Sequence, residues 1–358
     1  MMKIKGLLLL VALLAWVQGA FADDDVFEYD DDNNTIISGL VWGANPESLT
    51  IPASVTKVKT GAFEYATNLV ELIIKGGNPL FESGVFGEDV PLATLNLGSG
   101  MSTNNILRLI KTIGRGNQLT QIDIDGFTGE FDPYEWDETA MGEYLSSNVI
   151  VSLPAELVDD QVFGHAQVYG HFSLEHDLVT FCGKQSFTDI DNPNWVIYVP
   201  THLENGSVYI KRVPYIYGNE GVLLHYAEGM SPDAYLPRDL DLEGSYDSNM
   251  LVGVTEPTTI GETDGDKTNF VLYEGKFYPT SGGTLGANRA YLQVPTSEVE
   301  NLSNLTIIYE EEEDGIIQLR REETAAQRAG WYTLGGQRIS QPQQAGIYVH
   351  NGRLETVK

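Results

Sequence analysis

The chain has little cysteine and little positive charge. Its 358 residues include one cysteine, Cys182, and 21 lysines and arginines against 51 aspartates and glutamates, for a formal net charge of −30. A single cysteine cannot form a disulfide within the chain, so packing must hold the fold together. The negative charge would repel nucleic acid and anionic membrane surfaces, and we exclude both as partners.

The chain also has few motifs that carry chemistry. It contains no G-x-S-x-G sequence and no glycine-rich phosphate loop. His165, His171 and His176 with Cys182 offer zinc-ligand types, but His171 neighbours an apolar phenylalanine in a strand pattern and is expected to point outward. We therefore predict no catalytic residue, no metal site and no cofactor.

A repeated block is the most informative pattern that is present. An apolar residue and a phenylalanine are followed, after five residues, by three apolar positions spaced L-x-x-L-x-L. Successive ladders lie roughly 20–29 residues apart, and units of this length must stack to bury their apolar faces. The last ladder positions are Ile51, Ile74, Leu97, Ile124, Leu153 and Leu174. In the third full copy, the ladder after Phe163 is predicted to use Tyr169, Phe172 and Leu174.

Two copies of this block resemble the BspA-like leucine-rich repeat of surface proteins from Gram-negative anaerobic bacteria. The first runs from Ser48-Leu-Thr-Ile-Pro to Leu69-Val-Glu-Leu-Ile-Ile, and the second joins Gly84-Val-Phe to Leu92-Ala-Thr-Leu-Asn-Leu. The resemblance implies a secreted or surface-held module that recognises a ligand or mediates adhesion without enzymatic activity.

The amino terminus has the pattern of a signal peptide. Lys3 and Lys5 precede an apolar stretch at 7–16, and Ala20-Phe21-Ala22 forms a small-x-small cleavage site before an acidic run. The apolar stretch is too short for a membrane anchor. We expect cleavage after Ala22 and an extracytoplasmic location, either secreted or on the outer cell surface.

Two helices and a change of pattern are expected further along the chain. Apolar spacing predicts a helix at 104–113 and a shorter one at 138–145. After residue 175 the repeat ends, and short strand-like runs separated by turn residues predict an antiparallel sandwich or barrel. These runs are 178–181, 195–199, 207–213, 221–226, 250–254, 270–273, 276–278 and 290–294.

The last stretch begins with five acids at 310–314, which indicate a solvated linker. Gly335-Gly336 and Asn351-Gly352 each predict a tight hairpin. The segment Gly346-Ile-Tyr-Val-His-Asn-Gly-Arg resembles carboxyl-terminal type IX sorting tails, although the chain has no Pro-Asn-Pro motif before it. A small hairpin packed on the preceding domain is the alternative.

Together these patterns predict a mixed α/β leucine-rich repeat solenoid, then a mostly antiparallel β-sandwich-like domain and a C-terminal β-hairpin tail. The expected boundaries are a signal peptide at 1–22, a repeat domain at 23–175, a β-sandwich-like domain at 176–309, and a linker with its tail at 310–358.

Candidate binding residues fall into two groups. Outward positions of the ladders are expected to form an exposed face, and they are Glu71, Thr94, Asn96, Gln121 and Asp123. Asp123-Ile-Asp125-Gly126 begins like a calcium loop but lacks the later ligands in register. Tyr134 and Trp136 lie in an insertion between ladders, where an aromatic face among carboxylates is suited to sugar.

The sequence therefore predicts a non-enzymatic exported surface protein that recognises an extracellular protein or glycan through its repeat face. The alternative is a glycan-binding or glycan-degrading accessory protein acting through Trp136 and its neighbouring carboxylates Glu135, Asp137 and Glu138. Adjacent carboxylates on one loop do not by themselves provide a separated acid and base, so catalysis is the less favoured part of that alternative.

Overall fold

The structure is a computed structural model of the chain. It describes residues 26–124, 127, 131–188, 195–226 and 231–310, together with the backbone of strands at 331–333, 338–339, 346–350 and 353–357. The predicted signal peptide, its cleavage site and residues 311–314 of the acidic run lie outside the described residues.

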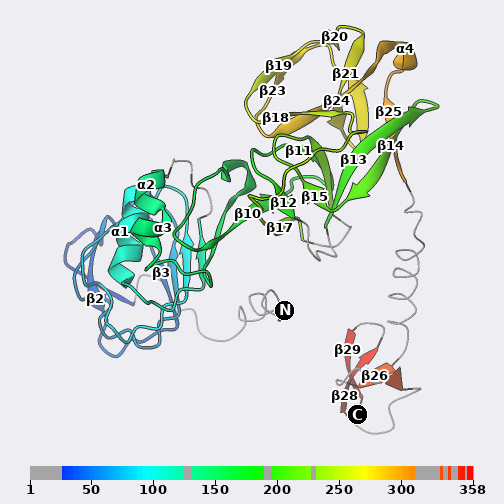
Figure 1. The fold of residues 1–358 in the computed structure, drawn as a ribbon. Helices are drawn as coiled ribbons and strands as arrows, with labels where there is room; N and C mark the ends of the chain where they lie inside the picture. The colour runs from blue at the N-terminus through cyan, green and yellow to red at the C-terminus, as the bar shows by residue number, and fades with distance from the viewer. Residues whose placement is uncertain are drawn as a thin grey trace.

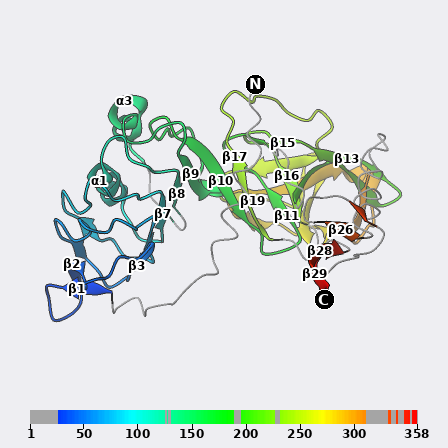
Figure 2. The ribbon, with the colours of Figure 1, turned by 90° about the horizontal axis from the view of Figure 1, so that it is seen from below.

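A seven-stranded sheet organises the first half of the molecule. The first six of these strands pair in parallel, and the last pairs antiparallel with its neighbour. In spatial order the strands are β3 (Ser48–Ile51), β5 (Glu71–Ile74), β7 (Thr94–Leu97), β8 (Gln121–Asp123), β9 (Ile150–Pro154), β10 (Gln167–Ser173) and β17 (Asp233–Pro237). Figure 2 shows this succession as a colour change from blue to green along the sheet.

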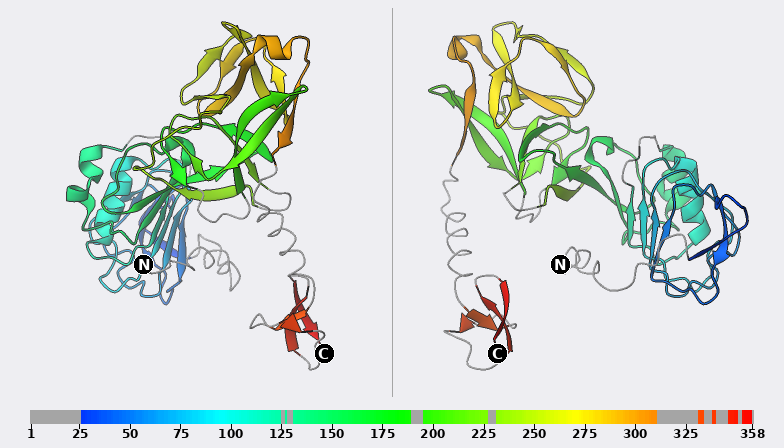
Figure 3. Two further views of the ribbon diagram at one scale, coloured as in Figure 1. Left: turned by 45° about the vertical axis from the view of Figure 1, so that its right-hand side comes forward. Right: turned by 180° about the vertical axis from the view of Figure 1, so that it is seen from behind.

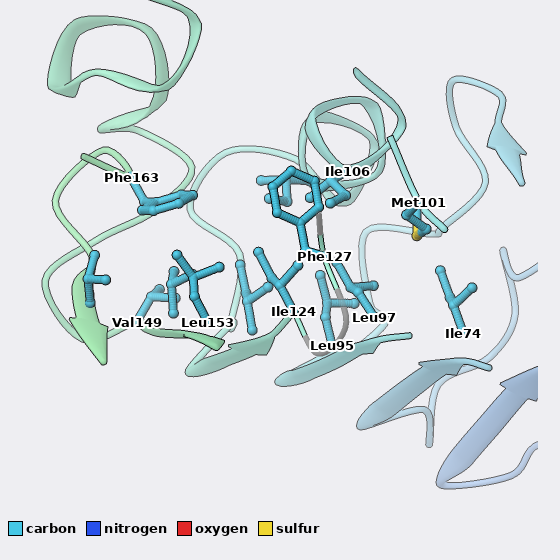
Figure 4. Packing of buried hydrophobic residues seen from close by; sticks show 14 of the residues in the cluster. Ile74, Leu95, Leu97, Met101, Ile106, Ile124, Phe127, Val149, Leu153 and Phe163 are labelled. Carbon is cyan, nitrogen blue, oxygen red and sulfur yellow. The ribbon is translucent and has the colours of Figure 1, made fainter. Parts of the chain in front are cut away.

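The core lies on one face of this sheet. Because side chains alternate along a strand, the ladder residues of each strand point to the same side and stack on those of the next. The buried pairs include Leu49 and Ile51, Leu72 and Ile74, and Leu95 and Leu97. Figure 4 shows strand residues such as Ile74, Leu97 and Leu153 pointing into the core, on the side of the sheet where the helix that carries Ile106 lies.

That helix, α1 (Thr103–Ile113), covers the core opposite the sheet (Figure 1). Ser102 caps its start by accepting a hydrogen bond from the Asn105 N–H at 3.3 Å, and Gly114 follows its end with a φ of 99°. This agrees with the helix predicted at 104–113. The shorter predicted helix is replaced by α2 (Pro133–Trp136) and α3 (Glu138–Met141), followed later by the 3₁₀ turn η1 (Ala155–Leu157).

A second, four-stranded sheet forms from the segment before the first ladder and from the connections between the first three ladders. Its strands are β1 (Phe27–Tyr29), β2 (Ile36–Leu40), β4 (Lys57–Val58) and β6 (Leu80–Phe81). Phe63 and Phe86 make a parallel bridge, and their rings lie 5.7 Å apart. The phenylalanines of the first two repeated blocks therefore lie side by side, with Phe63 buried and Phe86 half-buried.

A ten-stranded sheet builds most of the second half. Its main path is β11 (Leu178–Phe181), β16 (Val222–Tyr226), β13 (Trp195–Glu204), β14 (Ser207–Val213), β25 (Leu305–Tyr309), β22 (Lys276–Pro279), β21 (Lys267–Tyr273), β24 (Arg289–Pro295) and β18 (Leu251–Val254), with β20 (Thr263–Asp264) on β21. The pairing of β14 with β25 is parallel and the others are antiparallel.

The ends of this sheet approach each other. The Ala290 N–H of β24 donates to the Thr180 hydroxyl of β11 at 3.2 Å, and the Asn288 amide donates to the Cys182 carbonyl at 3.1 Å. Figure 3 shows the green strands facing the yellow and orange ones. The sheet is therefore close to a barrel, with its own core of residues such as Ile210, Leu223 and Phe270.

Smaller elements complete the described fold. They are the pair β12 (Phe187–Thr188) with β15 (Tyr215–Ile216), the pair β19 (Thr258–Ile260) with β23 (Gly283–Leu285), the helix α4 (Thr296–Val299), and a last sheet of β26 (Trp331–Thr333), β27 (Arg338–Ile339), β28 (Gly346–His350) and β29 (Arg353–Val357). The strands of that last sheet pair antiparallel, with His350 opposite Arg353.

The predicted fold class, a mixed α/β leucine-rich repeat solenoid followed by a β-sandwich-like domain, is wrong. The structure is mostly β, with 41% strand and 10% helix, and it combines mixed sheets with a near-barrel sheet. Short strands, rather than helices, make several of the connections behind the parallel strands. In the second half, the hydrogen bonds that Thr180 and Cys182 accept draw the sheet ends together, so one curled sheet replaces two stacked ones.

The ladder predicted after Phe163 is also wrong in register. Leu153 pairs with Gly170, so Val168, Gly170 and Phe172 are the buried residues of β10, while Tyr169 points to the other face. A Cβ at position 170 would lie 2.6 Å from Cε1 of Phe187, so a glycine is needed where that ring packs. Phe172 in turn contacts Phe181, Phe187 and Trp195, which makes the core continuous across the boundary predicted at residue 175.

Candidate functional site

The outer face of the seven-stranded sheet carries side chains in two rows, and we call these rows the sheet face. Strands paired in register place equivalent residues side by side. The first row is Ser48, Glu71, Thr94, Gln121, Ile150 and Gln167. The second row is Thr50, Ile73, Asn96, Asp123, Ser152 and Tyr169.

The structure brings all five predicted ladder residues onto this sheet face. Glu71, Thr94, Asn96 and Gln121 are half-buried there, with part of each side chain open to solvent. Glu71 also accepts a hydrogen bond from the Ser48 hydroxyl at 2.7 Å. These polar groups are spread over neighbouring strands and offer donors and acceptors to a flat or gently curved partner.

Asp123 departs from the prediction because it is buried, with 8% of its surface exposed. Its Oδ1 accepts a hydrogen bond of 2.9 Å from the hydroxyl of Ser152, which is itself 1% exposed. Strand alternation places Asp123 on the outer face, but alternation does not determine what covers an outward side chain. Asp123 is therefore a structural part of the sheet face rather than an exposed contact.

An aromatic group at the β17 end of the sheet face was missed by sequence reasoning. Antiparallel pairing of β10 with β17 sets Tyr235 opposite His171, and their rings stack with centroids 4.5 Å apart and planes 7° apart. His171 Nε2 lies 3.5 Å from Oδ1 of Asp233. His171 does point outward, as predicted, but its partners come from a strand that no repeat pattern marks.

The insertion between ladders does not present the predicted aromatic pair. Tyr134 is 84% exposed, whereas Trp136 is 1% exposed and its ring lies 5.0 Å from that of Phe131 and 5.4 Å from that of Phe163. Trp136 as a ligand contact is therefore wrong. The stretch looked like a surface loop, but α2 and α3 fold its apolar side onto the core, which only the tertiary structure could show.

An open cleft lies where α1 meets α2. It has a volume of about 610 Å³ and is lined by Leu80, Ser102, Asn104, Asn105, Leu107, Arg108, Lys111 and Glu135. The backbone N–H of Ser102 and the side-chain amide of Asn105 each donate a hydrogen bond of 2.9 Å to Oδ1 of Asn78. Glu135 is the single acid lining the cleft, so the described wall lacks the pair of opposed carboxylates that glycoside hydrolysis uses.

Metal and thiol chemistry have little support in the part of the chain that the structure describes. No group of three or more histidine, cysteine, aspartate or glutamate side chains there could hold a metal ion. Cys182 is fully buried, and burial, with a smaller effect from Glu220, raises the pKa of its thiol to about 11.

Among the described residues, none of the helices has the length and apolar character needed to cross a membrane.

Comparisons with protein-family models, with curated proteins and with solved structures found no match. The resemblances to BspA-like repeats and to type IX sorting tails thus stay predictions from the sequence.

Proposed function

We propose that the protein is an exported, non-enzymatic recognition protein that binds an extracellular ligand through its sheet face. The observation that supports this most directly is the gathering of Glu71, Thr94, Asn96 and Gln121, all partly exposed, on one face of one sheet. Residues far apart in the sequence are thereby brought side by side on one surface.

The physical properties of this surface suit recognition. Its backbone is already fixed by parallel hydrogen bonding, so binding would cost little ordering entropy. Ile73 and Ile150 place apolar area within the polar rows. The excess of acids over bases in the whole chain favours a partner with a basic surface, and we favour a protein ligand over a glycan on this ground.

A binding screen on the chain from residue 23 onward tests the proposal. The probes are immobilised fibronectin, laminin and collagen, together with an array of glycans. We expect saturable binding to a protein probe that weakens as salt is added, because charge attraction contributes. Failure to bind any protein probe would contradict the proposal.

Tyr134→Ala provides the second arm of the screen. Tyr134 is exposed beside the α1 and α2 cleft and is not part of the sheet face, so protein binding should be unchanged in this variant. Glycan binding that is lost with Tyr134 would instead support the alternative of a glycan-binding accessory protein. Release of shorter sugars from an arrayed glycan would contradict the non-enzymatic assignment.

A further inference from the structure

A second surface in the near-barrel region gathers aromatic and charged side chains. Tyr198 of β13, His225 of β16 and Tyr309 of β25 form a cluster, with ring centroids 5.2 Å apart for the tyrosine pair, 6.4 Å for Tyr198 and His225, and 6.0 Å for His225 and Tyr309. All three pairs meet edge to face. We call these three residues the tyrosine cluster.

The tyrosine cluster lies where the core of the near-barrel sheet reaches solvent. Tyr198 is opposite the buried Leu223, and Tyr309 is opposite the buried Ile210, so both tyrosines share a face with that core. Tyr309 is nevertheless 44% exposed. The cluster is thus anchored on one side by apolar packing and open on the other, as a ligand platform needs to be.

Charged groups of both signs lie beside the cluster. Arg212 is exposed and is the cross-strand neighbour of Tyr198, and it forms no ion pair with any other described residue. Asp177 lies at the start of β11, where its carbonyl accepts the Tyr226 N–H at 3.2 Å. Asp177 immediately precedes Leu178, the cross-strand partner of His225. Burial, Tyr198 and then the charge of Asp177 raise the pKa of Tyr309, in agreement with this placement.

We propose that the tyrosine cluster, with Arg212 and Asp177, binds a neutral sugar ring of a glycan. Tyrosine rings present apolar faces for the C–H groups of a sugar and hydroxyls at their edges. A guanidinium donates and a carboxylate accepts, so the pair satisfies sugar hydroxyls, which do both. A neutral sugar fits better than an acidic one because Asp177 and the net charge of −30 would both oppose an anion.

Sugar binding at the tyrosine cluster would not depend on the sheet face. The tyrosine cluster lies on strands of the ten-stranded sheet, whereas the sheet face lies on the seven-stranded one. A small oligosaccharide can therefore be used to test the cluster alone, and loss of one kind of binding leaves the other measurable.

The test is titration calorimetry of the chain from residue 23 onward with neutral hexasaccharides, namely cellohexaose, laminarihexaose and mannohexaose. We expect at least one of them to bind. Tyr309→Ala and Arg212→Gln should each weaken its affinity by about tenfold or more, since each removes a direct contact. Both positions are at least partly exposed, so these variants should keep the wild-type circular dichroism spectrum.

Tyr273→Ala is the matched control. Tyr273 is 62% exposed and pairs edge to face with Tyr278 at 6.2 Å, which makes a second tyrosine pair on β21 and β22, strands that carry no residue of the cluster. The affinity of Tyr273→Ala for the hexasaccharide should stay at the wild-type value. The proposal is overturned if no neutral hexasaccharide binds, or if all three variants weaken binding equally.

Discussion

Ser152 donates a hydrogen bond of 2.9 Å from its hydroxyl to the carboxylate of Asp123, across two neighbouring parallel strands. Both residues are buried although they occupy outward positions of the sheet. The middle of the sheet face is therefore stabilised by a polar contact that the repeat pattern does not reveal.

Ser152→Ala should lower the free energy of unfolding by about 1–3 kcal/mol, because a buried carboxylate loses a donor. The measurement is urea unfolding followed by circular dichroism. Ser48→Ala is the control: its hydroxyl makes the same kind of bond to Glu71, at 2.7 Å, in an exposed setting, and should cost less than about 0.5 kcal/mol. Equal losses in the two variants would contradict the structural role assigned to the buried pair.

Trp136→Ala should act on stability rather than on ligand contact. Removing an indole packed on Phe131 and Phe163 should cost about 3–5 kcal/mol, as for other large aromatic truncations in a core. Tyr134→Ala, two residues earlier on the exposed side, should change stability by less than about 0.5 kcal/mol. Thermal unfolding of both variants checks this, and a Trp136→Ala protein as stable as wild type would refute the buried placement.

Gly170→Ala should destabilise the fold by about 1–3 kcal/mol, because the new methyl group would overlap the Phe187 ring. Phe187→Leu replaces that ring by a smaller side chain. The double variant should therefore lose less free energy of unfolding than the sum of the losses in the two single variants. Denaturant unfolding of the four proteins in this cycle gives the coupling energy. If the losses of the two single variants simply add up to that of the double variant, position 170 does not contact Phe187.

The thiol of Cys182 should react slowly in the folded protein. Burial raises its pKa to about 11, so at about pH 8 little thiolate is present and access is blocked. Labelling with a chromogenic disulfide reagent should be slow without denaturant and fast in concentrated urea. Rapid labelling of the folded chain would show that Cys182 is accessible.

Local patterns predicted the individual elements better than their assembly. The run at 207–213 is β14 and the run at 178–181 is β11, because turn residues bound both. The runs expected at 270–273 and 276–278 also lie in strands, which a tight turn at Glu274-Gly275 joins with both residues at positive φ and Tyr273 opposite Lys276. Such signals are contained within a few residues and need no knowledge of the rest of the chain.

What sequence could not predict depended on contacts between distant segments. The strand β17, at Asp233–Pro237, completes the seven-stranded sheet and brings Tyr235 onto His171, yet its sequence resembles no ladder. The tyrosine cluster likewise joins Tyr198 to Tyr309 across the sheet. The burial of Trp136 and Asp123 depends on what packs over them, which alternation and spacing do not encode.

The central claim is that the sheet face binds a protein partner. The most direct test is the affinity of Asn96→Arg for the protein probe that the wild-type chain binds. The control is Lys111→Ala, at an exposed position of α1 on the opposite side of the core. We predict at least tenfold weaker binding for Asn96→Arg, because a long cationic side chain would disturb the middle of the sheet face, and unchanged binding for Lys111→Ala. Wild-type affinity in a folded Asn96→Arg protein would contradict it.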